Sequence, residues 1–171
     1  MKAEDWPWQY SFPPFFTVQP NLHTRSLQVS AWTSLVLKYH RINNQYVLDV
    51  QEAKSSLFTN PSIERTLPEE GITLVMSALV SSKNAEPIDK HRTRYHIYWH
   101  TLEEWAAILG SWATDTGHSG SVCTLYELIN TPNQEFTGMH QDVLIKVIKV
   151  LEAKNEAELI SLEDNNGVKF F

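Results

Sequence analysis

The sequence predicts an α+β protein in which two copies of one small helix-and-hairpin unit follow each other, behind a segment rich in aromatic residues and proline. Three observations support this fold class. Apolar residues recur at helical spacing in several stretches, and short strand-like runs lie between them. The order of these stretches repeats once along the chain, at offsets of 75 and 71 residues. The first twenty residues hold six aromatic side chains and four prolines, a composition that argues against an α-helix there.

The N-terminal segment, residues 1–23, is predicted to be extended or to adopt polyproline II. Proline fixes φ and keeps the preceding residue out of the helical region, which favours an extended backbone. Four rings alternate and would lie on one side of such a chain: Trp6, Trp8, Tyr10 and Phe12. These rings could pack on their own domain or on a partner. For Pro13, Pro14, Phe15 and Phe16 a partner is favoured, because a preformed proline segment loses little entropy on binding.

The first unit, residues 24–100, is predicted to begin with a long amphipathic helix. Its apolar face consists of Leu27, Ala31, Trp32, Leu35, Val36 and Tyr39. A short apolar stretch from Val47 then enters a second helix through Asp49 and Glu52. This spacing is typical of a capping box, in which the first side chain accepts from an early backbone N–H and the glutamate reaches back.

A second capping box, Thr66 and Glu69 with Pro68 in the first turn, predicts the third helix of this unit. The apolar residues of that helix fall on one stripe: Ile72, Val75, Met76 and Leu79. The helix is expected to end at Lys83-Asn84. Two short strands near residues 85–88 and 94–99 complete the unit.

The second unit, residues 101–171, repeats this order. Thr101 and Glu104 open a helix with the apolar face Trp105, Ile108, Leu109 and Trp112. Thr124 and Glu127 open a short helix after an apolar stretch. A third helix is expected to begin near Thr137, with a stripe of Val143, Val147, Ile148 and Leu151. Two strands near residues 158–162 and 168–171 follow, joined by a turn at Asn165-Asn166-Gly167.

Helix, short strand, helix, helix and hairpin is the order of a winged helix, a helix-turn-helix with a β-hairpin wing. The sequence therefore predicts two tandem winged-helix domains. No Gly, Pro or Ser spacer separates them, since the last strand of the first unit meets Thr101 almost directly.

Composition narrows the class of protein. The chain has 171 residues, of which 42% are hydrophobic, yet no run approaches the roughly 18 apolar residues of a membrane span. A secretory leader is not recognisable at the start, so we expect a cytoplasmic protein. Cys123 is the single cysteine, which excludes an internal disulfide. Residues 1–102 carry ten basic against nine acidic side chains, and residues 103–171 carry four against eleven. An acidic second half favours basic partners, although a solvated surface is the simpler reading.

We expect no enzyme activity, metal or cofactor. His96 and His100 could share one strand face, but no third ligand lies near them, and they are expected to be half-exposed beside the core face of Tyr95, Ile97 and Trp99. Cys123 corresponds to Leu48 in the first unit, which predicts a small buried apolar role instead of a nucleophile.

A nucleic-acid-associated winged-helix (transcription) factor is the alternative function. Such proteins place the third helix in the DNA major groove. Here that helix is nearly free of basic residues in the first unit, and the lysines of the second copy, Lys146, Lys149 and Lys154, are typical of a solvated face. The most basic cluster is the first wing, with Lys90, His91, Arg92 and Arg94. An exposed turn or a subunit contact is the favoured interpretation of this wing, and a contact with phosphate or anionic lipid is the alternative. No specific nucleic acid is expected as a partner, and the membrane is expected to be contacted only indirectly.

Four segments resemble a known family: WPWQY at residues 6–10, FPPFFT at residues 12–17, TLYEL at residues 124–128 and GVKFF at residues 167–171. They are similar to the small winged-helix subunit family of the ESCRT-II complex, and the resemblance runs from end to end of the chain. The proline-aromatic element is the specific part of it.

The resemblance implies a non-enzymatic adaptor in the sorting of ubiquitinated cargo into multivesicular bodies. It implies two copies of the chain in each complex, and a cytoplasmic complex recruited to the endosomal membrane as a peripheral assembly. Docking on the larger ESCRT-II subunits would involve Pro13, Pro14, Phe15 and Phe16, and we add the neighbouring Trp6 and Trp8. The second winged helix would recruit an ESCRT-III subunit. No motif marks that site, and the acids around the second hairpin are our candidates: Glu156, Glu158, Glu163 and Asp164.

Overall fold

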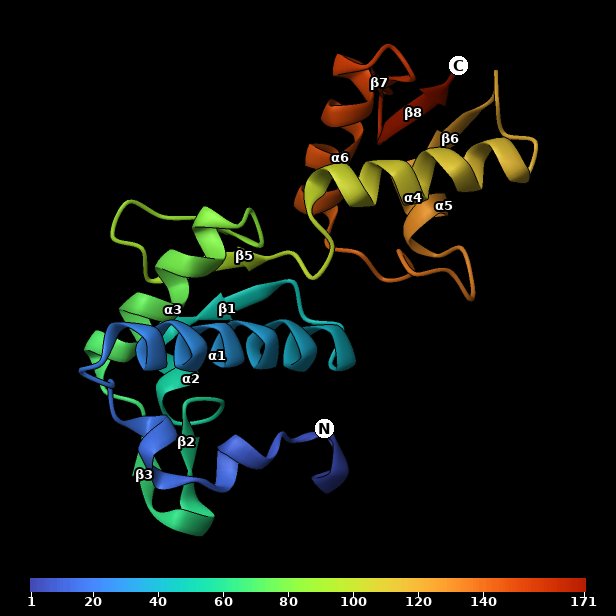
Figure 1. The fold of residues 1–171 in the computed structure, drawn as a ribbon. Helices are drawn as coiled ribbons and strands as arrows, with labels where there is room; N and C mark the ends of the chain where they lie inside the picture. The colour runs from blue at the N-terminus through green and yellow to red at the C-terminus, as the bar shows by residue number, and fades with distance from the viewer. The chain divides into compact units, whose positions relative to one another are not determined.

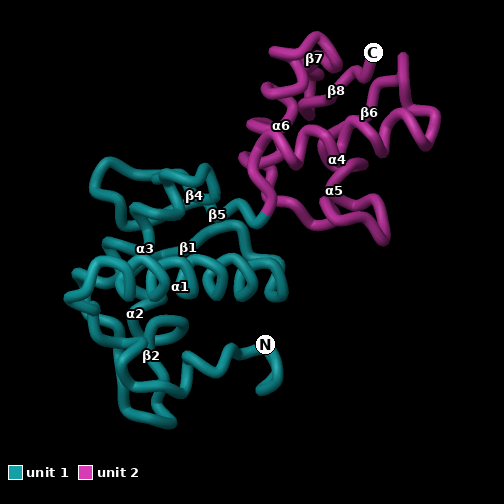
Figure 2. Tube along the Cα trace, viewed as in Figure 1, with its two compact units in different colours: residues 1–99 teal, residues 100–171 magenta.

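A computed structural model describes residues 1–171 and shows two compact units, residues 1–99 and residues 100–171 (Figures 1 and 2). Each unit has its own helices, its own three-stranded sheet and its own buried apolar residues. None of the helices combines the length and the apolar character needed to cross a membrane.

Unit 1 begins with three short 3-10 turns, at Ala3–Asp5, Trp8–Ser11 and Pro13–Phe16. The elements that follow are α1 (Leu22–Ile42), β1 (Val47–Asp49), α2 (Val50–Lys54), β2 (Thr59–Asn60), a 3-10 turn (Pro61–Ile63), β3 (Arg65–Thr66), α3 (Glu69–Ser81), β4 (Ala85–Pro87) and β5 (Arg94–Ile97). Strands β1, β5 and β4 form an antiparallel sheet with β5 in the centre, and β2 pairs with β3 in a separate ribbon. The sequence did not predict that ribbon.

Unit 2 repeats this architecture. Its elements are α4 (Leu102–Asp115), β6 (Val122–Thr124), α5 (Leu125–Ile129), α6 (Gln141–Ala153), β7 (Ala157–Ser161) and β8 (Asn166–Phe170). The sheet order is β6-β8-β7, so the last strand is again central and is flanked by the strand before the short helix. The prediction of two winged helices is confirmed.

The predicted apolar stripes of the third helices are buried. Two further residues of these helices are buried as well, Gly71 in α3 and Leu144 in α6. The stripe predicted for α1 is partly wrong, because Leu27 is exposed whereas Trp32, Leu35 and Val36 are buried. α1 begins at Leu22, ten residues before its first buried residue, Trp32, and Leu27 lies in that early part.

Three of the predicted helix starts carry side-chain caps. The Asp49 carboxylate accepts hydrogen bonds from the backbone N–H groups of Gln51 and Glu52, at 2.9 and 3.2 Å. The Thr101 hydroxyl accepts from the backbone of Glu104. Thr124 and Glu127 form the complete reciprocal box. These local interactions stabilise the first turn of each helix.

The predicted N-terminal ends of two helices, α3 and α6, are wrong. α3 has Pro68 at its N-cap without a side-chain cap, because Thr66 belongs to β3, where its hydroxyl is bonded to that of Thr59 across the ribbon. α6 begins at Gln141 behind His140, because the Thr137 hydroxyl donates to the carbonyl of Thr131 within the preceding loop.

The second hairpin also turns earlier than predicted. The turn closes with a bond from the Leu162 N–H to the Asn165 carbonyl, and Gly167 lies within β8, opposite Thr124 and Ile160. A Cβ at Gly167 would lie 3.1 Å from the backbone oxygen of Cys123, so this glycine permits a close approach of strands instead of a turn.

The prediction of half-exposed histidines is wrong for His96. Its residue is 5% exposed, and Tyr98 is buried as well as Tyr95 and Ile97. β5 is a central strand with neighbours on both edges, and its consecutive residues Tyr95, His96 and Ile97 are all buried, so both faces are covered there. His100 lies beyond the strand, where its Nε2 and Nδ1 are 2.7 and 3.4 Å from carboxylate oxygens of Glu135 and Glu104.

Candidate partner-binding surfaces

The N-terminal segment does not form a single extended run. Backbone N–H groups of Tyr10 and Phe15 donate to the carbonyls of Pro7 and Phe12, at 3.0 and 2.9 Å, and so close short turns. Pro13 and Pro14 open the last turn, where their fixed φ is compatible with helical geometry and their missing N–H groups are not needed. Because the chain turns, the alternate rings do not share one side.

Phe15 and Phe16 are buried in the core of unit 1, with 4% and 2% of their surface exposed. The Phe15 ring stacks on the indole of Trp32, with centroids 4.3 Å apart, and Phe16 meets the same indole edge-on at 5.3 Å. The Trp32 Nε1–H donates to the carbonyl of Phe15, at 2.9 Å. In this conformation the two rings hold the segment on its own domain, and their contact with a partner stays a prediction.

Tyr10 anchors the segment at a second point. Its hydroxyl lies 2.9 and 2.8 Å from the carbonyl oxygens of Leu57 and Thr59, and the Asn60 side chain donates to the carbonyl of Tyr10. Burial raises the pKa of Tyr10 to about 12, and the neighbouring Tyr39 adds to this shift. The phenol is therefore a neutral hydrogen-bond donor at physiological pH.

A contiguous part of the segment remains exposed. Trp8 is 70% exposed, Phe12 is 47% exposed, and their rings lie 5.6 Å apart. Pro13 and Pro14 are exposed beside them, whereas Trp6 is half-buried between Tyr10 and Tyr39. We call Trp8, Phe12, Pro13 and Pro14 the Trp8 surface. Phe12 was not among the predicted partner-binding residues, although its place directly before two prolines was a usable signal.

The four acids predicted for the second site do not form one patch. Glu156 precedes β7 at the base of the hairpin, and Glu158 lies opposite Lys169 across the β7–β8 pair. Glu163 and Asp164 are exposed in the turn at the far end of the hairpin. Five residue pairs of β7 and β8 lie between the two ends of the hairpin. Because a strand advances about 3.3 Å per residue, Glu156 lies far from Glu163 and Asp164.

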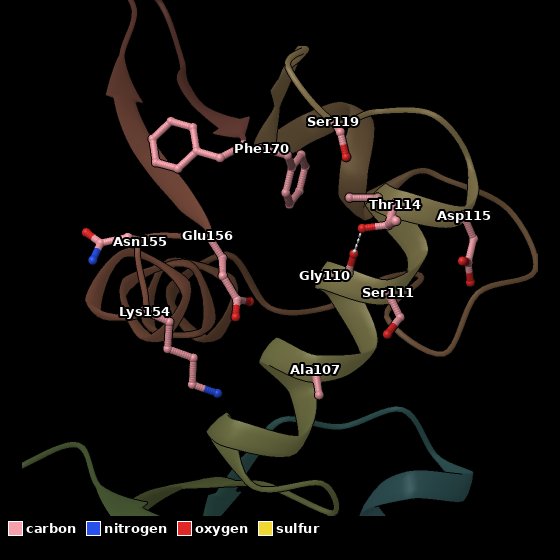
Figure 3. Close-up of a pocket in the computed structure, with 12 residues that line it drawn as sticks. Ala107, Gly110, Ser111, Thr114, Asp115, Ser119, Lys154, Asn155, Glu156 and Phe170 are labelled. Carbon is pink, nitrogen blue, oxygen red and sulfur yellow. Dashed lines mark hydrogen bonds between the residues drawn. The ribbon is translucent and has the colours of Figure 1, made fainter.

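A hollow of about 590 Å³ lies beside Glu156 (Figure 3). One wall is the surface of α4, formed by Ala107, Gly110, Ser111 and Thr114. The other walls come from the end of α6 and the base of the hairpin, where Lys154, Glu156 and Phe170 point toward the space. The small α4 side chains open this hollow, and the Thr114 hydroxyl is turned back onto the Gly110 carbonyl.

In unit 1 the third helix, which contacts DNA in many winged-helix proteins, is acidic at its start. α3 begins with Glu69 and Glu70, and Glu69 pairs with Lys54 at 3.1 Å. The first wing does expose Arg92 and Arg94. It is closed by the Asp89 carboxylate, whose pKa is lowered by hydrogen bonds from the Thr93 hydroxyl and from backbone N–H groups.

Cys123 is buried in β6, where it faces Val168 just as Leu48 faces Tyr95 in the first sheet. Burial raises the pKa of its thiol, and the nearby Glu127 adds to the shift, so the thiol stays protonated. This agrees with the predicted apolar role. No group of three or more His, Cys, Asp or Glu side chains is arranged to hold a metal ion.

The chain matches known proteins along its length. The family model described as "ESCRT-II complex subunit" matches residues 9–141. Vacuolar protein-sorting-associated protein 25 of Drosophila melanogaster is 41% identical to the chain, with all of both chains covered. The human protein of the same name is 43% identical over 98% of this chain and 97% of its own, and the Danio rerio protein is 45% identical over 98% of each.

Solved structures match the fold as well. The crystal structure of subunit VPS25 of the endosomal trafficking complex ESCRT-II has a TM-score of 0.85 and 31% identity, and covers 95% of this chain and 97% of that one. A chain in a structure of the ESCRT-II endosomal trafficking complex matches with the same score and identity over 97% and 99%.

Proposed function

We propose that this chain, which belongs to the ESCRT-II complex subunit family, is a non-enzymatic adaptor subunit of that complex in endosomal sorting. The observation that carries the proposal is the similarity over essentially the whole of both chains to relatives that are named as sorting proteins and solved as part of ESCRT-II. The cargo would be ubiquitinated protein destined for multivesicular bodies. The complex would be cytoplasmic and would reach the endosomal membrane as a peripheral assembly.

The Trp8 surface is the proposed contact with the larger ESCRT-II subunits. One similar solved structure is the crystal structure of the endosomal complex ESCRT-II with VPS22, VPS25 and VPS36, which supports larger subunits as partners. The buried rings of Phe15 and Phe16 fix the backbone of the segment, and this leaves Trp8, Phe12 and two exposed prolines displayed at low entropic cost. Trp6 is half-buried against Tyr10 and Tyr39 and holds the start of the segment on unit 1. Two copies per complex would use the same contact twice.

A co-expression pull-down with the two larger subunits tests this contact. The triple variant Trp8→Ala, Pro13→Ala, Pro14→Ala should fail to assemble, because an exposed tryptophan at an interface centre contributes about 2 kcal/mol or more. Its melting temperature should stay close to that of the parent chain, since all three side chains are exposed. The control is Leu22→Ala, which truncates another exposed apolar residue, 76% exposed, outside this surface. Normal assembly of the triple variant would contradict the proposed contact.

The second winged helix is the proposed recruitment site for an ESCRT-III subunit. The hollow beside Glu156 offers a concave surface lined by two carboxylates, Asp115 and Glu156, and one cation, Lys154, within a unit whose acidic side chains outnumber its basic ones. Such a surface would attract a basic helix, and the association rate should fall as salt is added.

Charge reversals separate the two ends of the hairpin. Glu156→Lys should slow recruitment of the ESCRT-III subunit, whereas the pair Glu163→Lys and Asp164→Lys measures what the hairpin turn contributes. Glu70→Lys, an exposed reversal in unit 1, is the matched control. Assembly through the Trp8 surface should survive all of them. Recruitment that is insensitive to every reversal and to ionic strength would show that the acidic side chains are only solvated.

A further inference from the structure

The internal repeat shows which surface of unit 2 lacks the cover that its counterpart has in unit 1. The last turns of α1 and α4 have the same hydrogen bonds. His40 and Ala113 each accept from the residue five positions on, and Tyr39 and Trp112 each accept from the residue four positions on. This alignment places Trp32 on Trp105, and each of these indoles is 1% exposed.

In unit 1 the N-terminal segment covers this face of α1. Trp6 lies against Tyr39, with ring centroids 6.1 Å apart, and stacks on Tyr10 at 4.2 Å. The Lys38 ammonium donates to the backbone carbonyl of Asp5 at 2.6 Å. The cover is thus an aromatic ring held beside the last turns of the helix, with one cation reaching over to the segment.

In unit 2 the aligned face is open. A groove of about 560 Å³ runs along α4 past Ile108, Ser111 and Trp112, which align with Leu35, Lys38 and Tyr39. Its far wall is the loop that carries Gln134 and Glu135. The Trp112 ring is already fixed by Phe136, edge-on at 5.2 Å, and by His118, stacked at 4.5 Å. An apolar floor with fixed rings is preorganised for a ligand.

The charges along this face of α4 differ from those along α1. Ser111 occupies the position of Lys38, whose ammonium donates to the Asp5 carbonyl in unit 1. The groove is bordered instead by the carboxylates of Asp115 and Glu135. The Glu135 carboxylate is hydrogen-bonded to His100. We therefore assign the contact with an incoming cation to Asp115. A cation therefore has to come from the occupant. A second copy's own N-terminal segment fits this requirement poorly, because its single cationic side chain, Lys2, is outnumbered by Glu4 and Asp5 and its rings are held in unit 1.

We propose that this groove of unit 2 binds a short aromatic segment of another protein, with a Trp or Tyr ring against Trp112 and Lys or Arg beside Asp115. The groove shares Ser111 and Asp115 with the hollow beside Glu156, but its floor of Ile108 and Trp112 lies outside that hollow. Signals from Ile108 and Trp112 therefore distinguish this site from the recruitment site proposed above.

The probe is a synthetic peptide of residues 1–10 with Glu4→Lys and Asp5→Lys, added to the full-length chain. Saturable NMR shifts are expected for the Trp112 indole N–H and the Ile108 methyl groups, with weaker binding at higher salt. Ser111→Arg should lower the affinity by about tenfold or more, because a guanidinium beside Asp115 would neutralise that carboxylate and repel the lysines of the peptide. The control Thr114→Arg adds the same charge on α4, on the side that lines the other hollow, and should bind like the parent chain.

Three results would overturn the proposal. The first is the absence of shifts at Trp112, or shifts at Trp32 instead, which would mean exchange into unit 1. The second is equal binding by the Ser111→Arg chain. The third is equal or tighter binding of the unmodified peptide of residues 1–10, which would identify a second copy of this chain as the occupant.

Discussion

At the residue scale, the most consequential placement is that of Phe15 and Phe16 against Trp32. The three rings form one buried cluster with Phe58, whose ring lies 5.5 Å from that of Trp32. The same short sequence that displays Pro13 and Pro14 therefore also completes a core. The N-terminal segment thus contributes buried rings to the core of unit 1 and exposed prolines to the proposed docking surface. Substitutions of the buried and of the exposed residues separate these two roles.

Truncation of the buried rings should destabilise unit 1. Each of Phe15→Ala and Phe16→Ala is expected to lower the free energy of unfolding by about 3 to 5 kcal/mol, because a large cavity remains beside Trp32. Chemical denaturation followed by tryptophan fluorescence measures this. The matched truncation Phe12→Ala removes an exposed ring and should change stability by about 0.5 kcal/mol or less. A fully stable Phe16→Ala chain would mean that its ring is not part of the core.

His40 makes the stability depend on pH. Its burial lowers the pKa from 6.5 to about 4, although the hydrogen bond between its Nδ1 and the Gln45 carbonyl acts in the opposite direction. The unfolded chain takes up the proton near pH 6.5 while the folded chain does not, so the contribution is complete above pH 6.5 and is lost as pH falls toward 4. The loss amounts to about 3 kcal/mol.

The measurement is the difference in unfolding free energy between pH 7 and pH 4 for the parent chain and for His40→Leu. The variant should lose about 3 kcal/mol less across this interval, whatever its absolute stability. His23→Leu, at an exposed position of α1, is the control and should follow the parent curve. Parallel curves for the parent and His40→Leu would mean that His40 has an ordinary pKa in the folded state.

At the scale of elements, the central strands β5 and β8 hold each unit together. Each pairs with the strand before the short helix on one edge and with its hairpin partner on the other. In β5 the consecutive residues Tyr95, His96 and Ile97 are all buried, so both faces of this part of the strand are covered, whereas β8 leaves Lys169 exposed. The central position of β8 explains the close approach of β6 at Gly167.

Two glycines should respond to alanine in opposite directions. Gly167→Ala places a Cβ 3.1 Å from the Cys123 backbone oxygen, which cannot move aside easily, and should cost about 1 to 3 kcal/mol. Gly110→Ala lies inside α4 with ordinary contacts of 3.6 Å or more and should stabilise by about 0.5 to 1 kcal/mol through helix propensity. Thermal melts of both variants test this pair, and a stabilising Gly167→Ala would contradict the strand register.

At the scale of the whole molecule, the chain is two independent cores in sequence. Unit 2 takes all of its sheet and its buried stripe from residues 100–171. Unit 1 takes three of its buried rings, Tyr10, Phe15 and Phe16, from the N-terminal segment. The segment is thus a structural part of unit 1 as well as its proposed docking surface.

Truncated chains should therefore behave differently. Residues 100–171 alone should fold cooperatively, because their core and sheet are self-contained. Residues 24–99 alone should be mostly unfolded or molten, because Trp32 and Phe58 lose the rings that cover them. Near-UV circular dichroism and thermal melts distinguish the outcomes. The matched fragment 1–99 should fold. A stable, cooperative 24–99 fragment would show that the segment only rests on the domain.

The sequence by itself determined the elements and their repeated order, because helical stripes such as Ile72, Val75, Met76 and Leu79, and local caps such as Thr124 with Glu127, depend on neighbours a few residues away. The proline-aromatic segment could be recognised for the same reason. Only the tertiary structure decided which rings of that segment are buried, why His96 is enclosed, and that Glu156 lies apart from Glu163 and Asp164. Burial and clustering depend on which distant surface a side chain meets, and Phe15 meets Trp32 seventeen residues away only after the chain has turned.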